Sequence, residues 1–532
     1  MRRLALLVLP LPLLWLWAQS STQPASPVST FPRGAMAVVE TKDFGKLLAE
    51  WNASQAKKEW LAGDAYKVWL NSRLGQRLSE AQDQFTEAAA FGVDSALLEQ
   101  LAGDRTAIAL YDAGELEFLA VSRMPEARFA ASALAQRRTS LQPRNAAGTP
   151  YFVSSNPVTR RTVAFAFRGE WAVLATKESL VAECLQRMAS AQASGLGAEE
   201  WYQRAARSSN AEGELRLVTN IDALYASPHF RSYWIHRNRT ELQPYIASIS
   251  DLDRAAGTWV ERRSLVRKQT QGAAGVAVDW ASLLRSVPAN AGLYRAWAAP
   301  DSDFAARLLI NKFAQPSGGA YRESNEAPSL GDNPEAGAES DWETDIGEAP
   351  FAVESQGIDS VRLARWLAAQ QVNGLLHVQS TRDVAGNVWI NFSTGVVLSR
   401  SSNWNENEAR AELDALGALI AVEGNRLFIA NNAGALAALF TANANAPSAP
   451  ASSTFAGGFR HAAERARYRR LMARIEQPFV RPLAQGEQRV PDFIDDIVPS
   501  VSRVVNTVTE QMVVMADPGD RVTQTITYRI AP

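Results

Sequence analysis

The stretch Gly92-Val93-Asp94-Ser95 returns almost unchanged as Gly357-Ile358-Asp359-Ser360. In the first occurrence, Asp94 or Ser95 precedes a helical apolar pattern carrying Leu97, Leu98 and Leu101. A side-chain oxygen at such a position accepts a hydrogen bond from the first free backbone N–H groups of a helix. The near-identical echo 265 residues later indicates an internal duplication.

Two further anchors recur in the same order around this pair. They are 35–44 with 293–304 upstream, at an offset of 260, and 166–175 with 421–430 downstream, at an offset of 255. Each pair shares an apolar run in a similar local context. Three offsets that differ by only a few residues are typical of two divergent copies with small loop changes.

The sequence predicts an α+β fold, with two duplicated modules of antiparallel sheet backed by helices and a C-terminal helix and hairpin. In the first module we expect a strand, several helices and two hairpins. They are a strand at 35–39, one long or two shorter helices within 57–91, hairpins at 106–121 and 163–175, and a helix at 126–138.

The N-terminus has the pattern of an export signal. A basic head at 1–3 precedes an apolar run at 4–17, which is shorter than the roughly 20 residues that a membrane-spanning helix needs. Small residues at 18–20 fit a signal-peptidase site, so we expect cleavage and a periplasmic or secreted location, with an uncleaved anchor as the alternative.

The predicted organisation has seven segments. They are a signal peptide 1–20, a flexible spacer 21–31, a first α+β module 32–190, an intervening partial unit 191–289, a second α+β module 290–442 with an acidic loop 317–350, a linker 443–454, and C-terminal helices and a hairpin 455–532. The last segment includes a predicted helix at 493–509 and a turn at 517–520.

Composition and cysteine content restrict the function. The formal charge of -2 and the lack of a concentrated basic face do not favour binding to nucleic acid. Cys184 is the single cysteine, so the chain has no internal disulfide. Its spacing from Val181 and Leu185 places it on an apolar helical face, and we interpret it as a small buried hydrophobe rather than a nucleophile.

Motifs of common enzyme classes are absent from the sequence. It has no His-Glu-x-x-His run, no Gly-x-Ser-x-Gly elbow, no phosphate-binding loop and no dinucleotide fingerprint. Ser54 and Lys57 have the Ser-x-x-Lys spacing of serine acyl-enzymes, and 208–210 resembles a second element of that class, but the third element is missing. We therefore predict no catalytic residues, no cofactor and no metal ligands; carboxylate pairs assembled in space stay open.

Three stretches are candidates for binding. The aromatic cluster 228–234 is either a ligand platform or core packing. The acidic residues of 323–348 form either a solvated loop or a calcium site, and the ligand spacing favours the loop. Arginines between Arg460 and Arg474 lie on a predicted amphipathic helix, which either contacts an anionic membrane or glycan, or is a solvated face of a docked helix.

Through 92–95, 357–360 and the two hairpin-helix anchors, the chain resembles the uncharacterised, predicted exported bacterial proteins built from paired α+β units. The resemblance spans most of residues 32–442 and implies no known activity or site residues. The leading hypothesis is a non-catalytic exported scaffold that binds an envelope protein or a cell-wall component. The alternatives are an envelope hydrolase with an unrecognised site and a protein in peripheral contact with an anionic membrane; the oligomeric state is left open.

Overall fold

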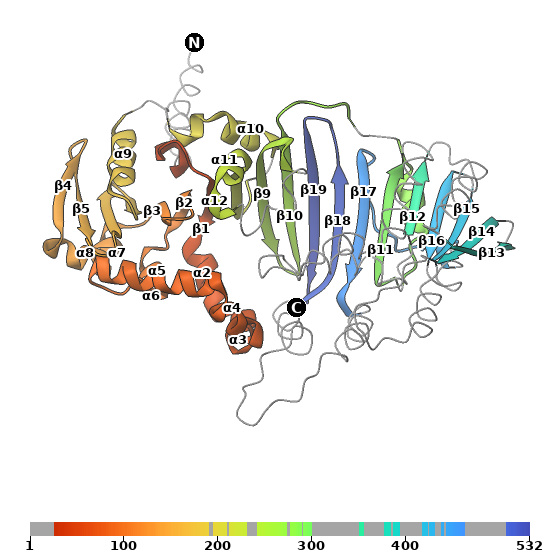
Figure 1. The fold of residues 1–532 in the computed structure, drawn as a ribbon, viewed down its shortest axis with the longest axis horizontal. Coiled ribbons are helices and arrows are strands. Elements are labelled where there is room, and N and C mark those ends of the chain that lie inside the picture. Colours follow the sequence, from red (N-terminus) through yellow and green to blue (C-terminus); the bar gives the residue numbers. More distant parts are fainter. Residues whose placement is uncertain are drawn as a thin grey trace, which may run out of the picture. The chain divides into compact units, whose positions relative to one another are not determined.

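The computed structural model describes residues 26–190, 195–209, 212–230, 242–273, 277–289, 291–299, 351–355, 377–384, 387–393, 418–423, 425–430, 438–440, 443–462 and 507–531 (Figure 1). The chain divides into two compact units. Unit 1 comprises Met1–Ala49 and Glu80–Gln203, and unit 2 comprises Glu50–Ser79 and Arg204–Pro532. Both combine antiparallel strands with helices, so the predicted α+β class is confirmed.

Unit 1 contains an antiparallel sheet with the strand order β1-β2-β3-β7-β6-β5-β4. The strands are β1 (Ala37–Asp43), β2 (Asp104–Asp112), β3 (Glu117–Arg123), β4 (Gln142–Ala146), β5 (Thr149–Ser155), β6 (Thr162–Arg168) and β7 (Trp171–Ala175). Both predicted hairpins are confirmed, as β2–β3 and β6–β7. The hairpin β4–β5 was missed; it turns at Ala147 and Gly148, both with positive φ.

Helices pack on both faces of this sheet. They are α5 (Arg73–Ala89), α6 (Ser95–Leu101), α7 (Glu126–Ala130), α8 (Ala133–Arg137) with the 3-10 turn η2 (Arg138–Ser140), and α9 (Glu178–Ala189). Phe165 of β6 packs with Phe129 and Leu134 on one face. Ala164 and Ala166 are fully buried on the other face, where α9 contacts strands β4 to β7.

Two predictions about single residues of unit 1 are confirmed. The Asp94 carboxylate accepts from Leu97 N at 3.0 Å and so caps α6. Cys184 is fully buried on α9, between Val181 and Leu185. Burial is the main cause of the raised pKa of its thiol, about 12. The thiol therefore stays protonated at neutral pH, and Cys184 is a packing residue.

Residues 26–36 are ordered, which corrects the prediction of a flexible spacer at 21–31 for its described part. Pro27–Thr30 form the 3-10 turn η1, Val28 is 1% exposed and Phe31 is fully buried. Phe31 O accepts from Leu196 N at 2.9 Å, at the start of η3 (Leu196–Ala198). The Ser, Thr and Pro composition favoured mobility, but the burial of two apolar side chains fixes this segment.

Unit 2 contains a longer sheet with the strand order β8-β9-β10-β19-β18-β17-β11-β12-β16-β15-β14-β13. The strands are β8 (Leu215–Asn220), β9 (Tyr245–Ala255), β10 (Thr258–Arg267), β11 (Leu293–Ala299), β12 (Phe351–Ser355), β13 (His377–Val384), β14 (Asn387–Ser393), β15 (Ala418–Glu423), β16 (Arg426–Ala430), β17 (Ser453–Arg460), β18 (Val508–Ala516) and β19 (Arg521–Ile530). These pairs are antiparallel, except for the parallel pair β11–β12.

Within the described residues, the helices that lie wholly in unit 2 are short. They are α3 (Gln55–Ala62), α4 (Asp64–Asn71), α11 (Ile221–Ala226), α12 (Pro228–Phe230) and α14 (Trp280–Arg285). The helices α2 (Phe44–Ala53), α5 and α10 (Glu200–Ser208) each contain residues of both units. Within the predicted helical stretch 57–91 the chain forms three helices, α3, α4 and α5, because it breaks near Gly63 and Ser72.

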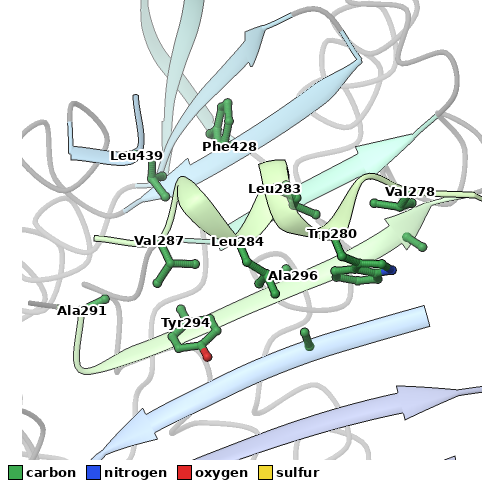
Figure 2. Close-up of a cluster of buried hydrophobic side chains, with 12 residues drawn as sticks. Val278, Trp280, Leu283, Leu284, Val287, Ala291, Tyr294, Ala296, Phe428 and Leu439 are labelled. Atoms are coloured by element: carbon green, nitrogen blue, oxygen red, sulfur yellow. The ribbon is translucent and has the colours of Figure 1, made fainter. Parts of the chain in front are cut away.

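The core of unit 2 lies between α14 and the strands β11, β16 and β17. Figure 2 shows Leu283 and Leu284 of α14 above Tyr294 and Ala296 of β11, with Phe428 of β16 nearby. All of these side chains are almost completely buried. The indole N–H of Trp280 donates to Ser453 O at 3.1 Å, so the one polar atom of this large ring has a partner.

A substitution at Gly458 tests the packing beside this core. A Cβ at this position would lie 2.2 Å from Cε1 of Tyr294, a side chain that is 1% exposed. We expect Gly458→Ala to lower the free energy of unfolding by about 1–3 kcal/mol, measured by urea denaturation. Gly272→Ala is the control, because its Cβ would meet nothing within 4 Å. Equal effects of the two substitutions would contradict the assigned packing.

The predicted duplication is not confirmed. The hairpins β6–β7 and β15–β16 do have similar neighbours, since each pairs with an antiparallel strand on either side. However, β1 pairs with β2, which follows the first motif copy 92–95, whereas β11 pairs in parallel with β12, which precedes the second copy 357–360. The second copy of the motif, 357–360, lies outside the described residues.

The units also differ from the predicted boundaries. Residues 50–79, predicted for the first module, belong to unit 2, and residues 195–203 belong to unit 1. The predicted linker 443–454 does not separate two domains, because β17 pairs with β11 and β19 pairs with β10, two strands that precede it. The sheet joins strands that are far apart in the sequence, and a linear pattern does not reveal such pairings.

Further corrections concern the C-terminal segment. The hairpin turned at 517–520 is confirmed as β18–β19. Arg460 ends the strand β17 and does not lie in a helix, and the end of the helix predicted at 493–509 is strand from Val508. The signal peptide, the acidic loop 317–350 and the arginines 465–474 lie outside the described residues.

Candidate functional site: a charge-lined pocket in unit 1

Unit 1 has a pocket of about 550 Å³ beside the start of α9. It is formed by the loop between β5 and β6, the turn between β2 and β3, the β7–α9 junction and one side chain of α5. The lining residues are Phe85, Glu115, Glu117, Tyr151, Arg160, Arg161, Thr162, Thr176, Lys177, Glu178, Ser179 and Ala182. The lining is therefore dominated by charged and hydroxyl side chains.

The three carboxylates of the pocket each have a cationic partner. Arg161 Nη1 lies 3.6 Å from Glu115 Oε2, and Lys177 Nζ lies 2.8 Å from Glu117 Oε1. Glu178 Oε1 lies 3.5 Å from Arg144 Nε and also accepts from the Tyr151 hydroxyl at 3.0 Å. Burial, followed by the hydrogen bond to Glu178, raises the pKa of Tyr151, so its hydroxyl stays protonated and donates.

Arg161 lines the pocket, and its guanidinium is held in place by its neighbours. Its Nε donates to Gln84 Oε1 at 3.0 Å, its Nη1 donates to Glu115 O, and its guanidinium lies 5.2 Å from the centre of the Phe85 ring. A guanidinium held in this way loses little further freedom when a ligand binds. Arg161 therefore contributes shape and positive potential rather than a movable contact.

Arg160 differs from its neighbour. Its side chain is exposed, and the described part of the chain shows no hydrogen bond or ion pair to it. Its backbone has φ of 59°, in the left-handed region that non-glycine residues seldom adopt. Asn156 fixes this loop, because its Oδ1 accepts from Val158 N at 2.8 Å and from Thr159 N at 3.2 Å. The loop thus presents one unpaired cation at the pocket.

The arrangement is suited to binding a polar ligand. Each of the three carboxylates is paired with a cation, Glu178 with Arg144 from outside the lining, which leaves Arg160 as the cation available for an anionic group. Hydroxyls of Thr162 and Ser179 add hydrogen-bonding capacity at the same wall. Within the described residues, no cluster of three or more His, Cys, Asp and Glu side chains could hold a metal ion.

The Ser-x-x-Lys fragment has a structural role. Ser54 Oγ donates to Trp51 O at 2.7 Å and accepts from Lys57 N at 3.1 Å, which makes Ser54 the N-cap of α3. The Lys57 ammonium donates to Asn52 Oδ1 at 2.6 Å instead of contacting the serine. The spacing therefore reflects helix capping, and the structure does not show a nucleophile with an adjacent base here.

The other sequence candidates are only partly described. Residues 228–230 form α12, and the remainder of the aromatic cluster 228–234 lies outside the described residues. Arg460 Nη1 donates to Ala289 O at 2.6 Å and to Ala291 O at 2.8 Å, and its Nε lies 3.5 Å from Glu510 Oε1. This arginine therefore ties β17 to the turn before β11.

The pocket was not predicted from the sequence. Its residues come from four separate loops and helix ends, with no fixed spacing between them. The available signal was local: the pair Arg160-Arg161 follows Asn156-Pro157, a turn-forming dipeptide. That signal indicates a loop carrying two cations but does not reveal which carboxylates lie opposite.

Comparisons with known proteins give little further information. No protein-family model matches the chain, and no curated protein matches it. Among solved structures, crystal form I of TP0453 is similar at 11% identity with a TM-score of 0.25, over 47% of this chain and 81% of that one. Crystal form III gives 12% identity and a TM-score of 0.24, over 46% and 82%. Similarity at this level transfers neither a site nor a function.

Proposed function

We propose that this chain is a non-catalytic, exported binding protein and that the pocket of unit 1 holds its ligand. The observation that carries the proposal is the combination of three internally neutralised carboxylates with the unpaired Arg160. A general acid or base needs a carboxylate free to exchange a proton with the substrate. Carboxylates held in ion pairs instead build a fixed, charge-patterned surface for recognition. Export is supported by the N-terminal pattern of residues 1–20.

The pocket favours a small polar ligand over an envelope protein as the partner. Its volume of about 550 Å³ falls within the range of small-molecule sites. Its lining suits a ligand that has an anionic group, for Arg160, together with hydroxyls or amides. A cell-wall fragment with peptide carboxylates and sugar hydroxyls has this chemistry.

The substitution Arg160→Gly tests this proposal. We expect it to weaken binding of soluble cell-wall disaccharide-peptides by about tenfold or more, because a hydrogen bond to a charged group is removed. The fold should tolerate it, because glycine adopts φ of 59° without strain. Isothermal titration calorimetry measures the affinity, and thermal unfolding measures the stability.

Arg138→Ala is the matched control, since Arg138 is also exposed in unit 1 but does not line the pocket. It should bind like the unsubstituted chain. If the disaccharide-peptides do not bind at all, or if Arg160→Gly binds them unchanged, the pocket is not the site.

An envelope hydrolase is the alternative. The hydroxyls and carboxylates that line the pocket are the groups such an enzyme would use. Turnover of ester, amide or glycoside substrates that is lost on substitution of Ser179 or Glu178 would support the hydrolase over the binding protein.

A further inference from the structure

Exposed apolar side chains concentrate in one segment of unit 2. Among the described residues, nine large hydrophobic side chains are exposed, and six of them lie between positions 51 and 78. They are Trp51, Leu61, Trp69, Leu70, Leu74 and Leu78, between 37% and 52% exposed. Single exposed hydrophobic residues are ordinary, but a local concentration of this kind marks an interaction surface. We call residues 50–79 the helical arm.

The helices of the arm contribute almost nothing to a core. α3 has no buried residue, and α4 buries only Ala65. The larger rings contact each other instead, since Tyr66 lies 5.8 Å from Trp60 and 6.0 Å from Trp69, measured between ring centres. An amphipathic helix normally directs its apolar side chains into the core of its own domain. Here they stay at the surface, available to a partner outside the chain.

The charge of the arm differs from that of the remaining chain. The arm has five basic and three acidic side chains, whereas the other 502 residues have 49 basic and 53 acidic ones. Two of the three acidic side chains are already paired, Glu50 with Arg254 at 2.7 Å and Asp64 with Lys67 at 2.7 Å. Five basic against three acidic side chains give the arm a net formal charge of +2, of the sign that an anionic surface attracts.

The composition of the arm favours a lipid surface over a protein partner. Three lysines of the arm lie close in the sequence to its aromatic residues. The lysines are Lys57, Lys58 and Lys67, and the aromatic residues are Trp60, Tyr66 and Trp69. Lysine is depleted at the centre of protein–protein interfaces. At a bilayer surface the same mixture is favourable, because Trp and Tyr rings sit at the headgroup level while lysine ammonium groups reach the lipid phosphates.

We propose that the helical arm docks on the surface of an anionic lipid bilayer, with its exposed Trp and Leu side chains in the headgroup region. The docking is peripheral: in the described part of the chain, no helix has the length and apolarity needed to span a membrane. The contact of Arg254 with Glu50 and Glu214 holds the base of the arm to β9 and β8, so a docked arm would retain the whole of unit 2 at the membrane.

A fluorescent label tests the proposal at the arm itself. The only native thiol, Cys184, is fully buried with a pKa raised to about 12, so it does not compete for a thiol-reactive label. We would attach a nitrobenzoxadiazole label to Leu74→Cys and, as a control, to Leu98→Cys, two positions that are 52% and 40% exposed. Vesicles contain equal parts of phosphatidylglycerol and phosphatidylcholine, or phosphatidylcholine alone.

We expect the label at position 74 to brighten and shift to shorter wavelength with the anionic vesicles, and to respond less at high salt. The label at position 98 should not respond. The double substitution Trp69→Ser, Leu70→Ser should weaken vesicle binding by about tenfold or more, because two partly exposed apolar side chains no longer enter the interface. Leu98→Ser with Leu217→Ser, of similar exposure, should bind within about twofold of the unsubstituted chain.

Two results would overturn the proposal. In the first, the chain sediments with vesicles while the label at position 74 still reports water, which would place the membrane contact in another segment. In the second, the label responds to protein concentration without lipid, which would make a second copy of the chain the partner. Arg160→Gly should leave vesicle binding unchanged, so failure of the pocket proposal and failure of this one are distinguishable.

Discussion

Alanine in place of Asp251 is expected to lower the free energy of unfolding by about 3–5 kcal/mol. The Asp251 side chain is fully buried in β9, opposite Arg216 of β8, whose side chain is only 14% exposed. Its carboxylate accepts from Arg216 Nε at 2.7 Å, from Gly213 N at 3.1 Å and from the Ser209 hydroxyl. Alanine would remove all of these acceptors, including the carboxylate that pairs with the largely covered Arg216 guanidinium.

Asp253→Ala is the matched control for this prediction. Asp253 lies two residues further along the same strand and is paired with Arg262 at 2.7 Å, but both side chains are close to half exposed. Water replaces such a pair, so we expect a change below about 1 kcal/mol. Urea denaturation of both variants measures the difference. Comparable losses at 251 and 253 would show that Asp251 is not buried as described.

A double substitution tests whether the loss of stability comes from an unpaired charge or from the loss of the Asp251–Arg216 ion pair itself. Asp251→Leu with Arg216→Met removes both charges of this pair. We expect it to regain most of the stability that Asp251→Ala loses. If the double variant is as unstable as the single one, the pair is needed for packing rather than for charge balance.

Alanine in place of Phe31 is expected to lower the free energy of unfolding by about 3–5 kcal/mol, because a fully buried aromatic ring would be replaced by a cavity. The effect should be local to unit 1. Cys184 reports on it, since its thiol lies 3.5 Å from Thr30 Oγ1 in the same N-terminal segment. Release of that segment should make Cys184 react faster with a thiol reagent.

Leu98→Ala is the control, because Leu98 is 40% exposed and its loss should change the stability by less than about 1 kcal/mol. Its Cys184 should react as slowly as in the unsubstituted chain. A Phe31→Ala variant with unchanged stability and unchanged thiol reactivity would restore the interpretation of residues 26–31 as a flexible spacer.

The pocket and the helical arm suggest how binding and localisation are divided in this chain. The pocket belongs to unit 1, and its conformation is fixed by ion pairs and by the Asn156 loop. The arm belongs to unit 2 and presents apolar side chains that no core of the described chain requires. We propose that one unit recognises a polar ligand while the other keeps the protein at an anionic membrane.

The local features of this protein follow from its amino-acid sequence alone. Alternating apolar residues predicted the hairpins β2–β3 and β6–β7, the oxygen of Asp94 predicted a helix cap, and the i, i+3, i+4 pattern around Cys184 predicted its burial. These features depend on neighbours within a few residues along the chain. For this reason, periodicity and capping chemistry are sufficient to predict them.

The fold of the whole chain sets which distant segments meet. The pairing of β10 with β19 joins residues more than 250 positions apart, and the pocket brings Lys177 to Glu117 and Arg161 to Glu115 from separate loops. It also decided that Phe31 is buried while Trp69 and Leu74 stay exposed. A sequence pattern gives the polarity of a side chain, but burial and ion pairing depend on what packs against it after the chain has folded.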